Sequence, residues 1–300
     1  MKKVYAFILT GFIALISFSQ DNNFLVYSFK GNVSVIQNNV EAKAKIGNIL
    51  NNNTKIKLAV GSTVTMVCNQ AAMFTISKAG SYSLSQFKDS CTTSSSSITA
   101  NYLRYVWSQM TSHGEGAPGS NRKAFMNTVG AVSRSVNNIW IDPRLDTINY
   151  VSGDFPLSWK SYADANEFEF MLYTNEKAKK PDFTTTVKKL KVPISTINKN
   201  LKPGNTYYWT AAVKGEQNDE WKVLTIVSKD KYDAMVNAYK AMGPASENSA
   251  EQSYRIAFML EDAHFLSDAY QYYLKAATAE PTNMLYRSTL MSFKKDYEIK

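Results

Sequence analysis

The sequence predicts a multidomain protein that is mainly β in its first two-thirds and α-helical at its C-terminal end. Apolar and polar residues alternate with period 2 between Phe24 and about Phe87 and again between 138 and 228, which is typical of half-buried strands. After residue 229 the apolar residues recur at helical spacing instead. The chain of 300 residues is also longer than a typical single domain. The predicted segments are a signal peptide (1–19), a small β domain (20–92), a helical or flexible linker (93–137), a β-sandwich (138–228) and a helical segment (229–300).

The first segment is typical of a secretory signal peptide. Two lysines form a positively charged start, and Val4 to Phe18 is an almost unbroken apolar run. The run is about 15 residues long, whereas a membrane-spanning helix needs about 20. Small residues at the end of the run predict cleavage between Ser19 and Gln20. We therefore expect an exported protein, and the alternative is an uncleaved N-terminal anchor.

The small β domain carries an ordered series of glycines and aliphatic residues. A Gly31-x-Val33-x-Val35 strand is followed by a Gly47-x-x-Leu50 turn and by two further alternating segments. This series resembles the FecR-like domain, a small all-β module of bacterial envelope proteins, over about 65 residues. The resemblance implies a place in the periplasm or at the cell surface of a Gram-negative bacterium. An unrelated β-roll remains the alternative.

The only two cysteines, Cys68 and Cys91, lie in or just after this β domain. An exported protein can keep a disulfide, and a bridge between them would stabilise the fold by about 3 kcal/mol in the entropic description. Two separate thiols are the alternative. With only two histidines in addition, the chain shows no metal-ligand spacing.

One amphipathic helix is predicted within the linker. Ile98, Tyr102, Val106 and Met110 recur at helical spacing and would pack on a neighbouring domain. The following stretch, 113–121, contains three glycines and a proline, which is typical of a flexible loop.

The next segment, 138–228, is predicted to be a β-sandwich of six or seven short strands, with tryptophans suited to its core. The spacing of Leu201, Pro203-Gly204 and Tyr207 resembles the tyrosine corner of fibronectin type III domains. The resemblance implies that the Tyr207 hydroxyl bonds to backbone upstream of it. It also implies that Trp159 and Trp209 fill the core.

The helical segment contains the most specific motif of the chain. The 34 residues from Ala250 to Asn283 are similar to a tetratricopeptide repeat, in which small residues allow two helices to cross closely. The matching residues are Ala257, Leu260, Ala269, Tyr273, Ala276 and Pro281. The sequence departs from the repeat pattern at Ser253, a position where the repeat usually has a large aromatic residue. Only one repeat is clear, so the neighbouring helices must supply packing.

Candidate catalytic residues are few. His113 and Glu115 lie in the glycine-rich loop, which does not hold two groups at a productive distance. His264 lies beside two acids in the turn between the repeat helices, as helix-end histidines often do. No nucleotide-binding, phosphate-loop or nucleophile motif is found. We therefore expect neither an enzyme nor a cofactor.

The formal charge is +9, and removal of the two lysines of the signal peptide leaves +7. Export argues against nucleic acid as a partner and makes anionic glycans or lipid head groups the more plausible counterparts. The alternative is that the scattered lysines only keep the protein in solution. Six lysines between 177 and 191 would either attract an anionic glycan or protect a sheet edge from aggregation.

These features together indicate a non-catalytic exported envelope protein that acts as a protein–protein interaction or scaffold module. Paired helices offer a groove for a partner protein or peptide, so the predicted working surface is the helical end and its junction with the sandwich. The alternative is a periplasmic regulatory or sensing component built around the FecR-like domain.

Overall fold

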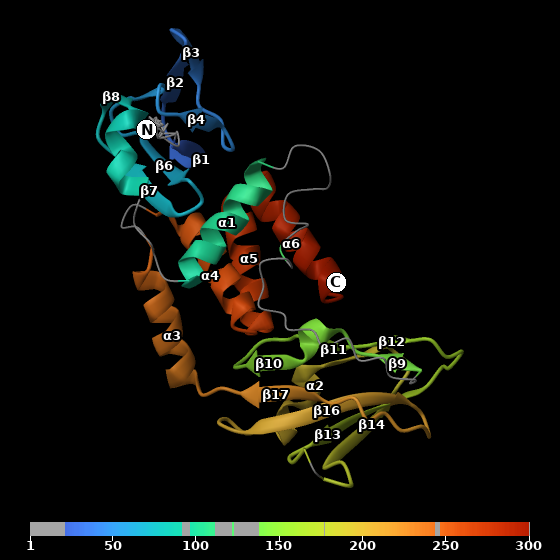
Figure 1. Cartoon of the computed structure of the whole chain (residues 1–300). Helices are drawn as coiled ribbons and strands as arrows, with labels where there is room; N and C mark the ends of the chain where they lie inside the picture. Colours follow the sequence, from blue (N-terminus) through green and yellow to red (C-terminus); the bar gives the residue numbers. More distant parts are fainter. Residues whose placement is uncertain are drawn as a thin grey trace, which may run out of the picture.

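The structure is a computed structural model. It describes residues 22–91, 97–111, 122, 138–176, 178–243 and 247–299. In the range 97–111 the side chains are described from residue 100 onward. Antiparallel sheets occupy the first two-thirds of the chain and helices the C-terminal end, which confirms the predicted order of β before α. Figure 1 shows an N-terminal β unit at one end, a second β unit at the other and the helices between them. The predicted signal peptide and its cleavage position lie outside the described residues.

The N-terminal unit consists of two four-stranded sheets with the orders β4-β1-β6-β7 and β3-β2-β5-β8, in which neighbouring strands are antiparallel. Their inward apolar side chains form one core, which Val35, Ile56 and Met66 share. The elements are β1 (Asn23–Lys30), β2 (Val33–Gln37), β3 (Val40–Lys43), β4 (Ile49–Asn51), β5 (Lys55–Leu58), β6 (Thr63–Cys68), β7 (Ala72–Ile76), β8 (Gly80–Ser83) and the 3-10 helix η1 (Leu84–Cys91).

Cys68 at the end of β6 and Cys91 at the end of η1 form a disulfide with a Cα–Cα distance of 5.3 Å. Both residues belong to the core between the two sheets. The bond therefore ties the last turn of the unit to its central sheet.

Strand β1 is buried on both of its faces, because the sheet lies between two cores. Phe24 and Val26 point into the core between the sheets, whereas Leu25 and Tyr27 point toward the helices. The pairing of β1 with β6 shifts register between Val26 and Ser28, which indicates a β-bulge. A bulge can turn two consecutive side chains to the same side, and both Tyr27 and Ser28 reach the helical end.

The second β unit is built from a five-stranded sheet, β10-β17-β16-β13-β14, and from two short pairs, β11-β15 and β12-β9. Strand β10 runs parallel to β17, and all other pairs in the unit are antiparallel. The strands are β9 (Ile139–Trp140), β10 (Thr147–Tyr150), β11 (Pro156–Ser158), β12 (Lys160–Ser161), β13 (Phe168–Tyr173), β14 (Phe183–Val187), β15 (Lys191–Pro193), β16 (Thr206–Val213) and β17 (Lys222–Ile226). Short helical turns lie at η3 (Pro143–Leu145), α2 (Ile194–Ile197) and η4 (Asn198–Asn200).

Aromatic side chains fill the space between these layers. Trp159 and Trp209 are both buried; Trp159 contacts Phe168 at 6.4 Å between ring centroids, and Trp209 stacks on Phe170 at 5.8 Å. The Tyr207 hydroxyl on β16 accepts a hydrogen bond from the Lys202 backbone N–H at 2.9 Å. This bond pins the start of β16 to the turn before it.

The helical end consists of α3 (Lys229–Ala241), α4 (Ser249–Asp262), α5 (Leu266–Ala279) and α6 (Met284–Asp296), with α1 (Ser97–Thr111) packed on them. Asn248 caps α4, since its side chain accepts from the N–H of Glu251 at 2.9 Å and Glu251 accepts from the N–H of Asn248 in return at 3.0 Å. Asn283 caps α6 with a single bond, since its side chain accepts from the N–H of Leu285 at 3.1 Å.

One apolar core runs from the N-terminal unit through the helical end into the second β unit. Leu25 of β1, Tyr105 of α1, Ala257 of α4 and Trp159 of the second β unit all belong to it. The helical end is therefore the central connection of the molecule. No helix in the described part of the chain is long and apolar enough to cross a membrane.

Candidate functional site

The residues of the predicted repeat meet between α4 and α5. Ala257, Ala269, Tyr273 and Ala276 are all fully buried, and the two helices pack closely. Small side chains at the crossing let the helix backbones approach each other. Pro281 lies two residues after the end of α5, where its missing N–H interrupts no helical hydrogen bond.

Helix α1 lies across α4 and α6 (Figure 1) and contacts both through the hydroxyl of Tyr105. The Tyr105 hydroxyl of α1 shares hydrogen bonds with the Tyr254 hydroxyl of α4 at 2.9 Å and with Thr289 Oγ1 of α6 at 3.0 Å. Tyr254 and Thr289 are themselves 2.8 Å apart, so the three hydroxyls form a closed triangle. The Tyr105 ring also stacks on Phe258 at 4.9 Å between centroids. In this arrangement α4 and α6 bind a helix of the same chain, α1.

Three of the four residues predicted to form the packing face of α1 do pack on the core: Tyr102 and Val106 are buried, and Met110 is half-buried against it. The side chain of Ile98 lies outside the described residues. Tyr105, which the spacing of the aliphatic residues did not single out, makes the central contacts. Its role depends on hydroxyl partners that are about 150 residues or more away in sequence, so no local pattern indicates it.

The N-terminal β unit docks on the same helices through polar contacts. Tyr27 of β1 shares a hydrogen bond with Tyr102 of α1 at 2.8 Å, and Ser28 donates one to the Glu251 carboxylate at the start of α4. Burial raises the pKa of Glu251 to about 7, and the nearby Glu247 and Glu280 act in the same direction, while the hydrogen bond from Asn248 opposes them.

Arg122 is a buried cation in the helical end and is 0% exposed. Its guanidinium donates to Glu261 of α4 at 2.8 Å and to Asp296 of α6 at 2.7 Å, and it lies over the Phe293 ring at 5.2 Å. The Tyr273 hydroxyl donates to the same Glu261 carboxylate at 3.0 Å. A buried charge needs such partners. The sequence placed Arg122 in the linker and gave no sign of this role.

The second β unit meets the helical end at the turn between α4 and α5. The backbone N–H of Asn149 on β10 donates to the His264 carbonyl at 2.9 Å, and the Ser267 hydroxyl donates to the Ser152 carbonyl at 2.9 Å. Strand β10 is an edge strand of its sheet, and this contact protects the edge from pairing with another chain. Gly153 adopts a φ of +93°, and a Cβ there would lie 2.6 Å from Ser267 Oγ, so both the backbone conformation and the close approach favour glycine.

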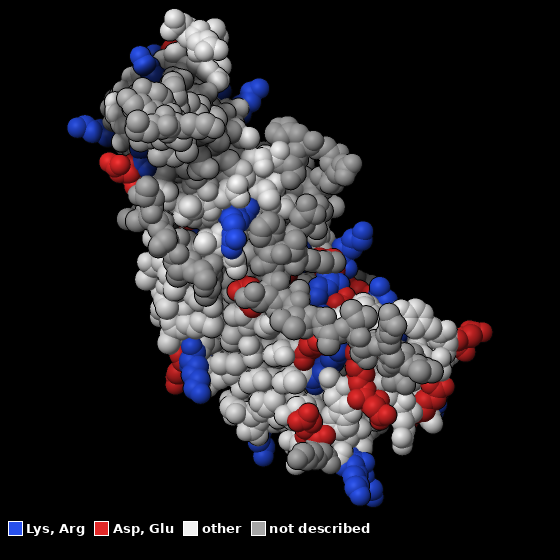
Figure 2. Space-filling model, viewed as in Figure 1, with Lys and Arg blue, Asp and Glu red and all other residues white. Residues whose placement is uncertain are grey.

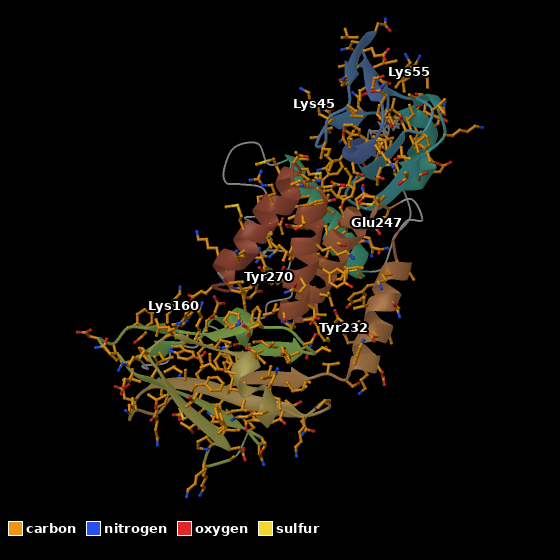
Figure 3. All side chains as sticks on the ribbon, turned by 180° about the vertical axis from the view of Figure 1, so that it is seen from behind. Lys45, Lys55, Lys160, Tyr232, Glu247 and Tyr270 are labelled. Atoms are coloured by element: carbon orange, nitrogen blue, oxygen red, sulfur yellow. A yellow bond between two sulfur atoms is a disulfide. The ribbon has the colours of Figure 1, made fainter. Side chains whose placement is uncertain are left out.

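Asp268 of α5 is a second carboxyl with a raised pKa at this junction. Burial raises its pKa to about 6, and the hydrogen bond with Tyr232 of α3 acts in the opposite direction. Figure 3 shows Tyr232 on α3 near the junction of that helix with the second β unit.

The remaining candidates are scattered. His264 lies in the α4–α5 turn with a φ of +61°, whereas His113 and Glu115 lie outside the described residues. Of the six lysines, Lys177 also lies outside them, and Lys191 donates to the Glu298 carbonyl at 2.9 Å. Within the described ranges, no group of three His, Cys, Asp or Glu side chains lies close enough to hold a metal ion.

A comparison with known protein families found no family that matches this chain, and a comparison with curated proteins found no match either.

Proposed function

We propose that this chain is a non-catalytic exported envelope protein that acts as a protein–protein interaction or scaffold module in the periplasm or at the surface of a Gram-negative bacterium. The observation that carries the proposal is the position of the helical end, which joins both β units through one core and already holds the amphipathic helix α1. A rigid hub of this kind suits a protein that fixes the spacing of other components.

We further propose that the N-terminal unit is FecR-like. Gly31 and Gly47 adopt φ values of +78° and +85°, in the left-handed region that favours glycine. Both are glycines of the sequence pattern on which the resemblance rests. Their conformation supports the turns that this pattern implies.

The second β unit is proposed to be fibronectin type III-like. The Tyr207 hydrogen bond to backbone five residues upstream supports a tyrosine corner. The layers of short strands also support it, since they enclose Trp159 and Trp209 as the two sheets of a sandwich enclose its core.

The helical end is proposed to be tetratricopeptide-like. The burial of Ala257, Ala269 and Ala276 at the α4–α5 crossing supports this assignment. Helix α6 follows α5 after a short turn and packs on it, as the next helix of such an array would.

Because α1 and the two β units cover much of the helical end, we place the partner contact on the outer face of α6. Met284 and Met291 are 61% and 67% exposed. They are seven residues apart, which puts them on one face of the helix. Methionine is common at surfaces that bind partner proteins.

The test is partner capture in native cells, by cross-linking of the full chain followed by mass spectrometry. A Met284→Glu, Met291→Glu double variant is expected to lose the captured envelope partners. Val60→Glu, which changes an apolar residue that is 92% exposed on the N-terminal unit, is the matched control and should keep them. The reverse result would favour the sensing alternative. N-terminal sequencing should find a chain that begins at Gln20, whereas a start at Met1 would contradict cleavage.

A further inference from the structure

A cavity of about 200 Å³ lies where the C-terminal turn of α6 meets the second β unit. Its walls come from β9, η3, the β11–β12 segment and the end of α6. Two contacts that connect the second β unit with the end of α6 involve its lining residues: the Arg144–Asp296 ion pair at 3.3 Å and the hydrogen bond from Lys191 to the Glu298 carbonyl. Figure 3 shows Lys160, one of the lining residues, on the side of the sandwich that turns toward the helices.

Strand alternation explains which side chains face the cavity. Ile139 and Ile141 are buried in the core, so Trp140 between them turns to the outer face. Leu157 and Trp159 are buried in the same way. The residues that follow each of them, Ser158 and Lys160, therefore lie on the outer face beside Trp140.

Trp140 is the aromatic wall of the cavity. Its ring is half-buried, and Lys160 Nζ lies 5.0 Å from the ring centroid. Lys160 is paired with Trp140 across the β12–β9 ladder and is itself exposed. An exposed lysine is easily displaced, so the ring is accessible to a ligand.

The charged residues of the lining balance each other. They are the cationic Arg144, Lys160 and Lys295 and the anionic Asp142, Asp296 and Glu298. Figure 2 shows side chains of both signs gathered where the helical end meets the sandwich. Arg144 is ion-paired with Asp142 and with Asp296, so the lining presents neither sign of charge in excess to a ligand. A hydroxyl group both donates and accepts hydrogen bonds, so a polyhydroxylated neutral ligand matches both the cationic and the anionic residues.

Ser158 is the second observation that points to a ligand. It is 7% exposed and lines the cavity, and its hydroxyl makes no hydrogen bond to another described residue, although its backbone lies in the β11–β15 ladder. The hydroxyl oxygen is not fully enclosed by protein, so it is open to the cavity. The hydroxyl of Ser158 can donate to a ligand oxygen or accept from a ligand hydroxyl.

We propose that this cavity binds a single neutral sugar unit, with one face of the sugar ring against Trp140 and its hydroxyls bonded to Ser158, Arg144 and the carboxylates of the lining. The volume fits a small ring better than a longer chain, because pockets for drug-sized ligands have about 300–1,000 Å³. The inference is independent of the scaffold function proposed above.

The test is saturation-transfer NMR on the full mature chain with a panel of neutral monosaccharides: glucose, galactose, mannose and N-acetylglucosamine. Glucuronate and glucosamine are the charged comparison probes. At least one neutral sugar is expected to give a signal that Trp140→Ala removes. Tyr162→Ala, which truncates an aromatic side chain that is 73% exposed on the same β unit, should leave the signal unchanged.

Ser158→Ala keeps the size of the buried side chain and removes only the hydroxyl, so it tests the site even if Trp140→Ala disturbs the fold. It should weaken the sugar's affinity by about fivefold, the typical effect of one hydrogen bond. The proposal is overturned if no neutral sugar binds, if only the charged sugars bind, or if the signal survives both Trp140→Ala and Ser158→Ala.

Discussion

Glu251 should make the stability of the protein fall as the pH rises from about 4.5 to about 7. Burial raises the pKa of this carboxyl from 4.5 to about 7. Because the folded-state pKa lies above the unfolded value, the protonated carboxyl favours the folded chain. Its stabilising effect is complete below about pH 4.5 and is lost as the pH rises through 7. A change in pKa of this size corresponds to about 3 kcal/mol in the free energy of unfolding.

The substitution that tests this is Glu251→Gln, which removes the titratable carboxyl group and keeps the shape of the side chain. The amide can still accept from Ser28, but its NH₂ group cannot accept from the Asn248 N–H, so the capping box loses one bond. We expect the variant to be about 1 kcal/mol less stable than the wild type at pH 4, where the stabilising effect of the protonated carboxyl is nearly complete. At pH 8 the order should reverse, with the variant about 2 kcal/mol more stable.

The assay is urea unfolding of the oxidised full chain at pH 4, 7 and 8. Asp268 also has a raised pKa, but it is present in both proteins and cancels in their difference. Glu176→Gln, at an exposed carboxyl, is the control and should show no crossover. A difference between wild type and Glu251→Gln that does not change with pH would refute the reasoning.

Three further predictions concern stability, and a fourth concerns the disulfide. Tyr207→Phe removes the acceptor that pins β16 and should lower the free energy of unfolding by about 1 kcal/mol, measured by urea unfolding. Ala269→Leu overpacks the α4–α5 crossing and should cost about 1–3 kcal/mol in the same assay. Arg122→Met leaves the buried Glu261 carboxylate without its cation, while Asp296 keeps its ion pair with Arg144, and should cost about 3–5 kcal/mol; an effect below about 1 kcal/mol would contradict a buried ion pair. Thiol labelling of the denatured, unreduced chain should find neither Cys68 nor Cys91 free, and two labelled residues would contradict the disulfide.

Local patterns in the sequence predicted the features that depend on neighbours in the chain. The alternation of strands, the helical spacing after residue 229 and the small residues of α4 and α5 are set by periods of two to four residues. Ala257 and Ala269 are buried as these periods require. The order of β before α could therefore be predicted.

Features that depend on distant partners could not be predicted. Arg122 stands in a polar linker, and its carboxylate partners are 139 and 174 residues further along the chain. The bulge in β1 that turns both Tyr27 and Ser28 toward the helices breaks the simple alternation. The cavity beside Trp140 joins residues from β9 and from the end of α6, so no single motif marks it.

The central claim is that the helical end presents a partner-binding surface on α6. Site-specific photo-cross-linking in native cells tests it most directly, with the photoreactive side chain placed at Met291 and, as the control, at Val60 of the N-terminal unit. The account predicts a defined adduct with another envelope protein from position 291 and no such adduct from position 60. An adduct from position 60 alone, or none from position 291, would contradict it.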